Sequence, residues 1–348
     1  MKVGIYNKYP DHLHFEPTSD CNARCPQCPR TFGASLLTNP ELNVTEWSAD
    51  DLKKVLDNDF FNDLKKVLIN GNYGDIVMHT NPKEIISVFL DLKFQQIQIN
   101  TNGGALGTEF WSWLGTHKNI LVEFGIDGLD DTHHLYRRNT RFDIVMKNAR
   151  AFIEAGGTAS WAMTVFKHNE HQIDKCSKLA KEYGFSSFKK RPSTRWSGED
   201  LIILDANMKE SYRLEPATEI ENRSSNLKNT STECNIECSV AKQNSVYLSA
   251  EGKLYPCCWM AFSDQQNLNS HKKSSFIQKF YKDYDYGLDF NNVIKNKIVD
   301  IIKSKIFVEI ENSWISDNQF DACKNHCVIN SNRNRQLNKT KIKSYYSQ

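Results

Sequence analysis

Ten cysteines are the residues of this sequence with the clearest capacity for chemistry, and they fall into groups. Three lie within eight residues near the start, Cys21-Asn-Ala-Arg-Cys25-Pro-Gln-Cys28, and six lie in the last third of the chain. Cys176 stands alone between the groups. A disulfide framework is normally denser and belongs to a shorter chain, and a zinc ribbon would show two CxxC pairs. The distribution therefore predicts two separate metal-binding regions.

The CxxxCxxC loop supplies three thiolates directly after the first strand that the sequence predicts. A [4Fe–4S] cluster has four irons and usually takes four cysteines. Three ligands leave one iron open to a small molecule, which chemistry at a cluster requires. Gly33 and the turns at Pro26 and Pro29 let the loop wrap a metal while backbone amides face the sulfurs. We therefore expect the first group to hold an open cluster.

Composition excludes several other classes of protein. The 348 residues carry 44 basic and 42 acidic side chains, a net charge of +2. This balance argues against a globally basic nucleic-acid binder and a disordered polyanion. No stretch approaches the roughly 18 apolar residues of a membrane helix, and the polar residues 1–10 show no secretory signal. We expect a cytoplasmic protein without a membrane partner, in which cysteines indicate metal or redox chemistry.

Short strand-like and helix-like segments alternate from about residue 12 to residue 195. The predicted strands are His12–Glu16, Lys66–Asn70, Gln96–Thr101, Leu121–Ile126, Ser160–Phe166 and Ser187–Arg191. The predicted helices are Thr45–Phe61, Pro82–Leu92, Glu109–His117, Phe142–Ala155 and Glu170–Tyr183, with Gly156 and Gly184 as C′ residues. This alternation predicts an α/β fold with a parallel sheet, open or closed as a partial barrel.

Composition changes divide the rest of the chain. Residues 12–196 form the predicted first domain, and the Ser-, Asn- and Thr-rich residues 197–233 are expected to be a loosely structured connection. Residues 234–330 hold six cysteines and an aromatic, lysine-rich insertion at 271–290. The basic residues 331–348 are expected to be a flexible tail.

The cysteine loop and its place after the first strand resemble the radical S-adenosylmethionine (SAM) enzymes. The resemblance implies a partial (β/α)6 TIM-like barrel in which Cys21, Cys25 and Cys28 bind a [4Fe–4S] cluster. The open iron of that cluster would chelate the amino and carboxylate groups of SAM. Electron transfer, from a donor such as flavodoxin or ferredoxin, would then cleave SAM to a 5′-deoxyadenosyl radical.

Turns after the second and third predicted strands are similar to further motifs of this family. Gly71-Asn72-Tyr73-Gly74-Asp75 resembles the GGE-type segment, in which backbone carbonyls and an acid hold the SAM ammonium. Thr101-Asn102-Gly103-Gly104 is similar to the TNG turn. The resemblance thus implies SAM contacts at Gly71, Asn72, Gly74, Asp75 and Asn102.

The fourth and fifth strands end in two more matches. Gly125-Ile126-Asp127-Gly128 is close to the SIDG motif, with glycine where the usual serine would contact SAM and with Asp127 available for a polar contact. Arg137 matches the arginine that pairs with the SAM carboxylate, a role suited to its planar fork, and Arg138 is an equally placed rival. The family contacts adenine near Val165 and Asn169.

The last third of the chain resembles the SPASM and Twitch domains of many radical SAM enzymes. Cys238, Gly252 and Cys257 reproduce the CX9–15GX4C signature, and Ser245–Leu248 with Leu254–Tyr255 predicts a β-hairpin. Six cysteines favour a Twitch-like single auxiliary [4Fe–4S] cluster over the two clusters of a full SPASM domain. The expected ligands are Cys238, Cys257, Cys323 and Cys327.

Alternatives remain open for this second site. Cys234 could replace any one of the four ligands, Cys258 is the alternative to Cys257, and structural zinc could occupy the same four thiolates. Cys176 has core-facing spacing in a helix, which predicts a small buried hydrophobe.

The substrate and the catalytic base cannot be assigned from the sequence. Polar residues that follow strand ends are candidates for substrate contacts: Tyr73, His79, His134, Tyr136, Lys167, His168, Arg191 and Arg195. The leading interpretation is an enzyme that abstracts a hydrogen atom from a small molecule or sugar, since the barrel begins almost at residue 1. A peptide-modifying enzyme is the alternative. An interpretation from another functional class is a non-catalytic iron–sulfur or zinc protein that binds RNA or a partner.

Overall fold

The computed structural model describes residues 5–6, 8–193, 200–218, 236–265, 287–314 and 320–327. Arg195, Cys234, most of the insertion at 271–290 and the basic tail at 331–348 lie outside the described residues.

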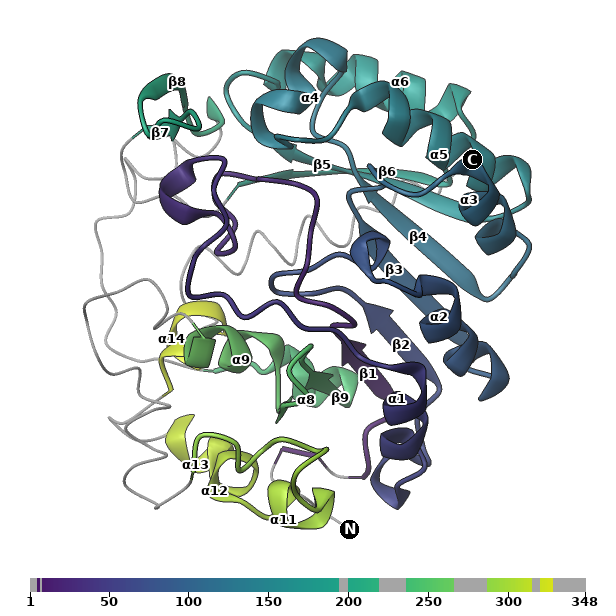
Figure 1. Cartoon of the computed structure of the whole chain (residues 1–348), viewed down its shortest axis with the longest axis vertical. Coiled ribbons are helices and arrows are strands. Elements are labelled where there is room, and N and C mark those ends of the chain that lie inside the picture. Colours follow the sequence, from purple (N-terminus) through teal and green to yellow (C-terminus); the bar gives the residue numbers. More distant parts are fainter. Residues whose placement is uncertain are drawn as a thin grey trace.

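A parallel sheet forms the centre of the molecule (Figure 1). Its first six strands are neighbours in chain order, all parallel, and they form a partial barrel that does not close. They are β1 (His12–Phe15), β2 (Lys66–Ile69), β3 (Gln96–Thr101), β4 (Ile120–Gly125), β5 (Thr158–Val165) and β6 (Ser187–Pro192). The predicted partial (β/α)6 barrel is confirmed.

The outer face of the sheet is apolar and covered by helices. Alternate strand residues such as Ile97, Ile99, Val122 and Phe124 are fully buried in the main core. Burial of each such side chain contributes roughly 1.5–3 kcal/mol. The covering helices are α1 (Ala49–Leu56), α2 (Pro82–Asp91), α3 (Thr108–Gly115), α5 (Phe142–Glu154) and α6 (Ile173–Glu182) (Figure 1).

Helix ends carry the local signals that the sequence predicts. The Ser48 side chain accepts a hydrogen bond from the Asp51 amide at the start of α1, and Pro82 occupies the first turn of α2. Gly156 and Gly184 follow α5 and α6 with φ of 93° and 82°. Both therefore lie in the left-handed region that favours glycine after a helix.

One helix prediction was wrong in its bounds, and one helix was not predicted. The helix expected over Thr45–Phe61 begins at Ala49 and ends at Leu56, and a separate 3₁₀ turn covers Asp59–Phe61. Helix α4 (Asp130–Tyr136) was missed. Its buried face consists of Thr132, His133 and Tyr136, so it shows no aliphatic periodicity.

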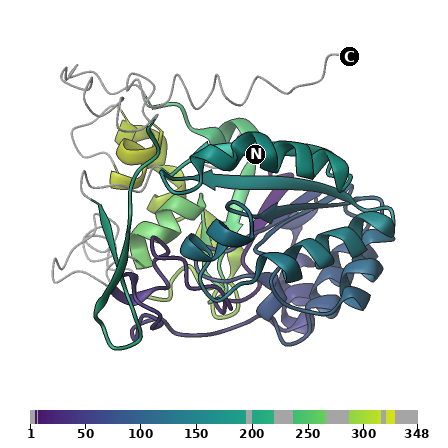
Figure 2. The same ribbon diagram turned by 90° about the horizontal axis from the view of Figure 1, so that it is seen from above.

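The expectation of a loosely structured connection was wrong for residues 201–214. They form an antiparallel hairpin of β7 (Leu201–Leu204) and β8 (Glu210–Leu214). Ile203 and Leu214 are buried in a small apolar cluster with Cys25, while the polar residues around them face outward. Figure 2 shows the hairpin beside the segment that contains the 3₁₀ turn η1 (Phe32–Ala34), so it packs against the cysteine loop.

The C-terminal part of the chain extends the same sheet. The predicted hairpin is present as β9 (Ser245–Leu248) and β10 (Leu254–Tyr255), and β9 pairs in parallel with β1. A short helix precedes this hairpin, α8 (Ser239–Gln243). Further short helices follow it: α9 (Cys258–Gln265), α11 (Ile298–Ile302), α12 (Lys305–Val308), α13 (Ile310–Trp314) and α14 (Asp321–His326). In the described part of the chain, no helix has the length and apolar character needed to cross a membrane.

Candidate functional site

The first three cysteines converge at the carboxyl end of β1. Cys25 is buried, and Cys21 and Cys28 are half-buried. Burial raises the pKa of the Cys21 thiol, and the nearby groups Asp75, Cys25 and Cys28 raise it further. Burial likewise raises the pKa of Cys25 to about 11. These thiols gain their thiolate form when they bind a metal, because ligation replaces the proton.

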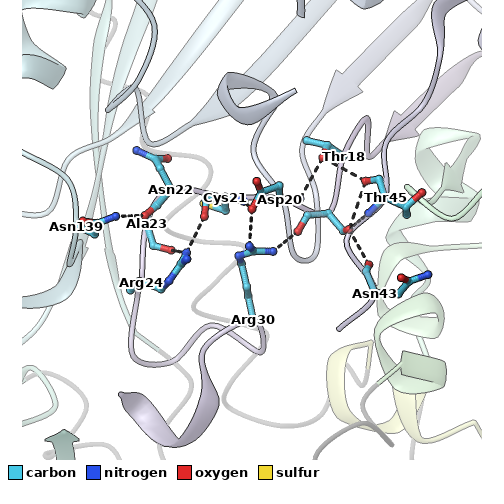
Figure 3. A network of polar contacts seen from close by, with 12 residues as sticks. Thr18, Asp20, Cys21, Asn22, Ala23, Arg24, Arg30, Asn43, Thr45 and Asn139 are labelled. Atoms are coloured by element: carbon cyan, nitrogen blue, oxygen red, sulfur yellow. Dashed lines mark hydrogen bonds and ion pairs between the residues drawn. The ribbon is translucent and has the colours of Figure 1, made fainter. Parts of the chain in front are cut away.

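Arg30 braces the start of the cysteine loop (Figure 3). Its buried guanidinium donates hydrogen bonds to the Ser19 carbonyl oxygen and to the Asp20 carboxylate. Asp20 Oδ1 also accepts a hydrogen bond of 2.8 Å from the Cys21 amide. One buried cation therefore fixes the backbone that presents the first cysteine.

Two further side chains hold the middle of the loop (Figure 3). Arg24 Nη1 donates to the Cys21 carbonyl oxygen at 2.7 Å, and Asn139 Nδ2 donates to the Asn22 carbonyl oxygen at 2.7 Å. The loop is thus tied both to itself and to the segment after α4, which reduces the conformational freedom that cluster binding would have to remove.

One specific observation indicates that the residues of the loop fit a bound cluster. The Arg30 Nε atom is buried and has no hydrogen-bond partner. Arg30 also interacts electrostatically with Cys21 and Cys28. A buried N–H without a partner, on a side chain that interacts electrostatically with two thiols, is the kind of donor whose hydrogen bond the sulfurs of a cluster accept.

The turn after β2 wraps around a buried carboxylate that the sequence did not single out. Glu16, the residue after β1, is 1% exposed and accepts hydrogen bonds from the Tyr73 amide at 2.8 Å and the Gly74 amide at 3.2 Å. A β-carbon on Gly71 would lie 2.4 Å from Glu16 Oε1, and one on Gly74 would lie 1.8 Å from the Thr18 carbonyl oxygen. Both glycines are therefore required for the close approach.

Asp75 and Asn102 form a connected pair beside Cys21. Asp75 Oδ2 accepts from the Asn102 amide at 2.7 Å and from Asn102 Nδ2 at 2.8 Å, and Oδ1 accepts from Thr101 Oγ1 and the Val77 amide. Asn102 Nδ2 also lies 3.6 Å from Cys21 Sγ. The four hydrogen bonds use the accepting positions of the Asp75 carboxylate, so this residue orients Asn102 toward the cysteine.

Asp127 and Arg137 form a second pair beside Cys25. Arg137 Nε donates to Asp127 Oδ2 at 2.7 Å, and its Nη1 lies 3.9 Å from Cys25 Sγ. Asp127 is fully buried, and its Oδ1 also accepts from the Thr164 amide. The aspartate thereby links β4, β5 and the arginine in one network.

Arg138, the rival of Arg137, lies elsewhere. It is buried, and its guanidinium donates to the Ala34 carbonyl oxygen at 2.9 Å and to the Leu204 carbonyl oxygen at 2.8 Å. Arg138 therefore joins the end of the cysteine loop to β7. Unlike Arg137, it does not contact Cys25.

Two other predicted cofactor residues have distinct surroundings. Asn72 Nδ2 donates to the Cys258 carbonyl oxygen at 3.0 Å, so the turn after β2 touches the C-terminal part of the chain. The Val165 side chain packs in the main core, whereas the next residue, Phe166, packs in the small cluster with Cys25. A contact from Val165 to a bound group would thus involve its backbone.

The cysteines in the described part of the C-terminal region interact with one another. Burial raises the pKa of Cys257, and nearby Cys258, Cys323 and Cys238 add to the increase. Burial also raises the pKa of Cys323 to about 12 and of Cys327 to about 11, and each of these thiols interacts with Cys238. Cys238, Cys257, Cys323 and Cys327, the expected ligand set, thus gather between α8, α9 and α14.

Cys258 has a different environment from Cys257. It interacts with Glu16 and Cys327, so it lies on the side that faces the turn after β2. In the described part of the chain, no three His, Cys, Asp or Glu side chains are grouped tightly enough to hold a single metal ion. In a [4Fe–4S] cluster each cysteine binds a different iron, an arrangement wider than a single-ion site. Cys176 is fully buried in α6.

Several candidate substrate residues have structural roles. His79 Nε2 bonds the Trp47 carbonyl oxygen at 2.8 Å, and its Nδ1 accepts from the Asn81 amide. His134 is exposed and lines a cleft of about 740 Å³ beside α4 and α5, which contains none of the predicted cofactor contacts. Lys167 is exposed and bonds Thr218 Oγ1 at 3.0 Å.

Three other candidates lie nearer the two cysteine groups. Tyr73 is buried against Phe262, with ring centroids 6.5 Å apart, and Tyr136 packs on Phe166 at 4.4 Å. His168 stacks on Phe166, and both of its ring nitrogens are buried without a hydrogen-bond partner. Burial lowers the pKa of His168 to about 4.

Comparison with known proteins identifies the family. A model of the radical SAM superfamily matches residues 15–180, and a model described as an iron–sulfur cluster-binding domain, SPASM, matches residues 238–328. The fold and the two cysteine groups are those of an iron–sulfur protein built on a partial barrel. The chain belongs to the radical SAM superfamily and carries a C-terminal SPASM domain, so it binds SAM and [4Fe–4S] clusters.

Solved structures share this fold at low sequence identity. SuiB of Streptococcus suis is 15% identical with a TM-score of 0.57, over 89% of this chain and 69% of that one. anSMEcpe with bound AdoMet is 16% identical with a TM-score of 0.53, over 94% of this chain and 95% of that one. No curated protein sequence matches the chain.

Proposed function

We propose that the chain cleaves SAM at the cluster held by Cys21, Cys25 and Cys28 and uses the radical to abstract a hydrogen atom from a polar substrate. The observation that carries this proposal is the convergence of the Asp75–Asn102 pair and the Asp127–Arg137 pair on these cysteines. A cluster that only carried electrons would not need an arginine and a carboxamide aimed at an incomplete set of thiolates.

The bound groups supply the radical chemistry. When bound, the first cluster and SAM would supply a 5′-deoxyadenosyl radical from one electron of a donor such as flavodoxin or ferredoxin, with methionine as the other product. This radical would take one hydrogen atom from the substrate to give 5′-deoxyadenosine. In an oxidation, the auxiliary cluster would supply the acceptor for the second electron, and a base would take the proton. The auxiliary ligands are proposed to be Cys238, Cys257, Cys323 and Cys327.

The side chains of this protein bind and orient SAM. Arg137 takes the SAM carboxylate, because its guanidinium is planar and lies beside Cys25. The Asp75 oxygens are engaged by four donors, so the carbonyl oxygens of residues 71–74 accept from the SAM ammonium. Phe166 and the backbone at Val165 would cover the adenine of SAM.

The substrate class is proposed to be a peptide. SuiB has been crystallised with its precursor peptide SuiA, in a structure that matches this chain with a TM-score of 0.50. anSMEcpe has been crystallised with a peptide as well. The second candidate is a polar small molecule or sugar, which is favoured by polar strand residues such as Glu123, Lys189 and Arg191 that alternate with the residues facing the helices. A cytoplasmic location is proposed because free cluster-binding thiols need a reducing compartment.

The experiment compares the two classes of substrate. The anaerobically reconstituted chain would be incubated with SAM, dithionite and either the peptide fraction or the small-molecule fraction of a cell extract. We expect the peptide fraction to increase 5′-deoxyadenosine formation and to yield a peptide of altered mass. An increase confined to the small-molecule fraction would replace the peptide with the second candidate.

A further inference from the structure

The two faces of the barrel sheet have opposite chemistry. The apolar residues of each strand face the helices, as Val122 and Phe124 do on β4 and Phe188 does on β6. Because side chains alternate along a strand, the residues between them face inward. We call this side, where Arg137 meets Gly125 of β4, the inner face of the sheet.

The inner face carries polar and charged side chains on most strands. They include His12, His14, Glu16, Lys66, Asn70, Gln98, Asn100, Glu123, Ser160, Thr164, Lys189 and Arg191. The inner face is thus built to contact water or a polar ligand, not to fill an apolar core.

Three of these residues form a charged group at the edge of the partial barrel. Glu123 on β4 accepts from Lys189 Nζ on β6 at 2.7 Å. Arg191 Nη2 lies 3.4 Å and 3.5 Å from the two Glu123 oxygens, so its hydrogen bonds are long. The Glu123 side chain is 8% exposed, whereas those of Lys189 and Arg191 are 43% and 62% exposed.

The charges of this group do not cancel. One carboxylate faces two cations, and its negative charge is already paired with Lys189 through the short contact. The strand residues that neighbour the group on the inner face, Ser160 and Asn100, are uncharged. A planar guanidinium with an exposed fork therefore remains available to a ligand.

The position of Arg191 relates it to the cofactor residues. Strand register places it opposite Thr164, whose amide donates to Asp127 Oδ1. Asp127 in turn holds Arg137 beside Cys25. Arg191 thus lies at the carboxyl end of the sheet, at the level of the proposed SAM site and one strand further toward the open edge.

We propose that Arg191 and Lys189 form an anion-binding subsite for the substrate, which would carry a carboxylate or a phosphate group. This inference rests on the proposed function for the identity of the ligand as substrate. Glu123 pairs with Lys189 and lies near Arg191. Its single charge leaves the subsite net positive, which attracts an anion and rejects a cationic group.

The test is a titration of the reconstituted, SAM-bound protein with inorganic phosphate and with acetate, followed by calorimetry. Bound SAM occupies Arg137, so phosphate binding there is suppressed. We expect saturable binding of at least one anion, roughly tenfold weaker in Arg191→Gln, because a charge-assisted hydrogen bond is lost. Glu123→Gln should bind the anion more tightly than the wild type, since it removes the competing carboxylate.

Lys190→Gln is the matched control, because Lys190 lies between the two cations on the opposite face of the same strand. It should bind the anion as the wild type does. Equal affinities for the wild type and Arg191→Gln, an equal loss in Lys190→Gln, or no saturable binding would each overturn the proposal. 5′-Deoxyadenosine formation by the wild type and Lys190→Gln tests the proposed function separately, and the titration decides the subsite whatever that assay gives.

Discussion

The guanidinium of Arg137 occupies the space that a side chain at position 125 would need. A β-carbon on Gly125 would lie 2.5 Å from Arg137 Nη2 and 3.0 Å from its Cζ. Glycine stands here where the related SIDG motif has serine. Glycine at this position thus leaves room for the arginine that lies beside Cys25 and is held by Asp127.

Gly125→Ala should therefore weaken SAM binding. The added methyl group displaces the Arg137 guanidinium from Asp127, and we expect the Kd for SAM to rise roughly tenfold through loss of a charge-assisted contact. Equilibrium dialysis of reconstituted protein measures this directly. Gly107→Ala is the control, because the nearest atom to a β-carbon there is 3.9 Å away. Unchanged affinity in Gly125→Ala would show that Arg137 does not need this space.

Acid should destabilise the fold through His133. This side chain is fully buried; its Nδ1 accepts from the Asp127 amide at 3.2 Å, and its Nε2 bonds Thr140 Oγ1. Burial lowers the pKa of His133 to about 4. The unfolded chain takes up this proton near pH 6.5, so stability falls as the pH drops from 6.5 to 4, by about 2 kcal/mol at pH 5.

Thermal unfolding between pH 7 and pH 5, followed by circular dichroism, measures this loss. His133→Gln should start from a lower Tm but lose less Tm on acidification than the wild type. The neighbouring exposed His134→Gln should follow the wild-type curve. An identical pH dependence in His133→Gln would contradict the assignment to this histidine.

Iron content should separate Cys257 from Cys258. Cys257 interacts with Cys238 and Cys323, whereas Cys258 interacts with Glu16 and, among the other ligands, with Cys327. The wild type should bind about eight irons per chain after anaerobic reconstitution. Cys257→Ala should lose about four of them, while Cys258→Ala and the buried helix control Cys176→Ala should keep them. Loss of iron in Cys258→Ala alone would make Cys258 the ligand.

Arg30 should raise the reduction potential of the first cluster. Its Nε–H is buried without a partner and its guanidinium interacts electrostatically with Cys21 and Cys28, so it is available to a sulfur of a bound cluster. Hydrogen bonds to cluster sulfurs favour the reduced, more negative state. Arg30→Lys keeps the positive charge but removes this donor. We expect the midpoint potential to fall by roughly 50 mV, measured by redox titration with electron paramagnetic resonance. An unchanged potential would give Arg30 a purely structural role, as the brace between Ser19 and Asp20.

The features predicted from the sequence are those that depend on local patterns. The CxxxCxxC loop, the strand alternation and glycines such as Gly156 act over a few residues, so they can be read along the chain. Helix α4 was missed because its buried face has His133 and Tyr136 in place of aliphatic residues. The hairpin of Ile203 and Leu214 was missed because two buried residues among polar ones carry little periodicity.

Other features depend on contacts between distant segments. Glu16 joins the turn after β2 to Tyr247 of β9, a residue 231 positions away, by a hydrogen bond of 2.8 Å. A single acidic residue after a strand gives no sign of that role. The choice of Arg137 over Arg138 likewise depends on which side of the chain meets Asp127 and which meets Leu204. Only the folded arrangement distinguishes the two.

The most direct test of the central claim is 5′-deoxyadenosine formation by the anaerobically reconstituted chain, given SAM and dithionite. Our account predicts that the wild type forms 5′-deoxyadenosine, and that Cys21→Ala forms none and lacks about four irons while keeping the auxiliary cluster. A wild-type protein with an intact first cluster and bound SAM that released no 5′-deoxyadenosine, with or without a cell extract as the source of substrate, would contradict it.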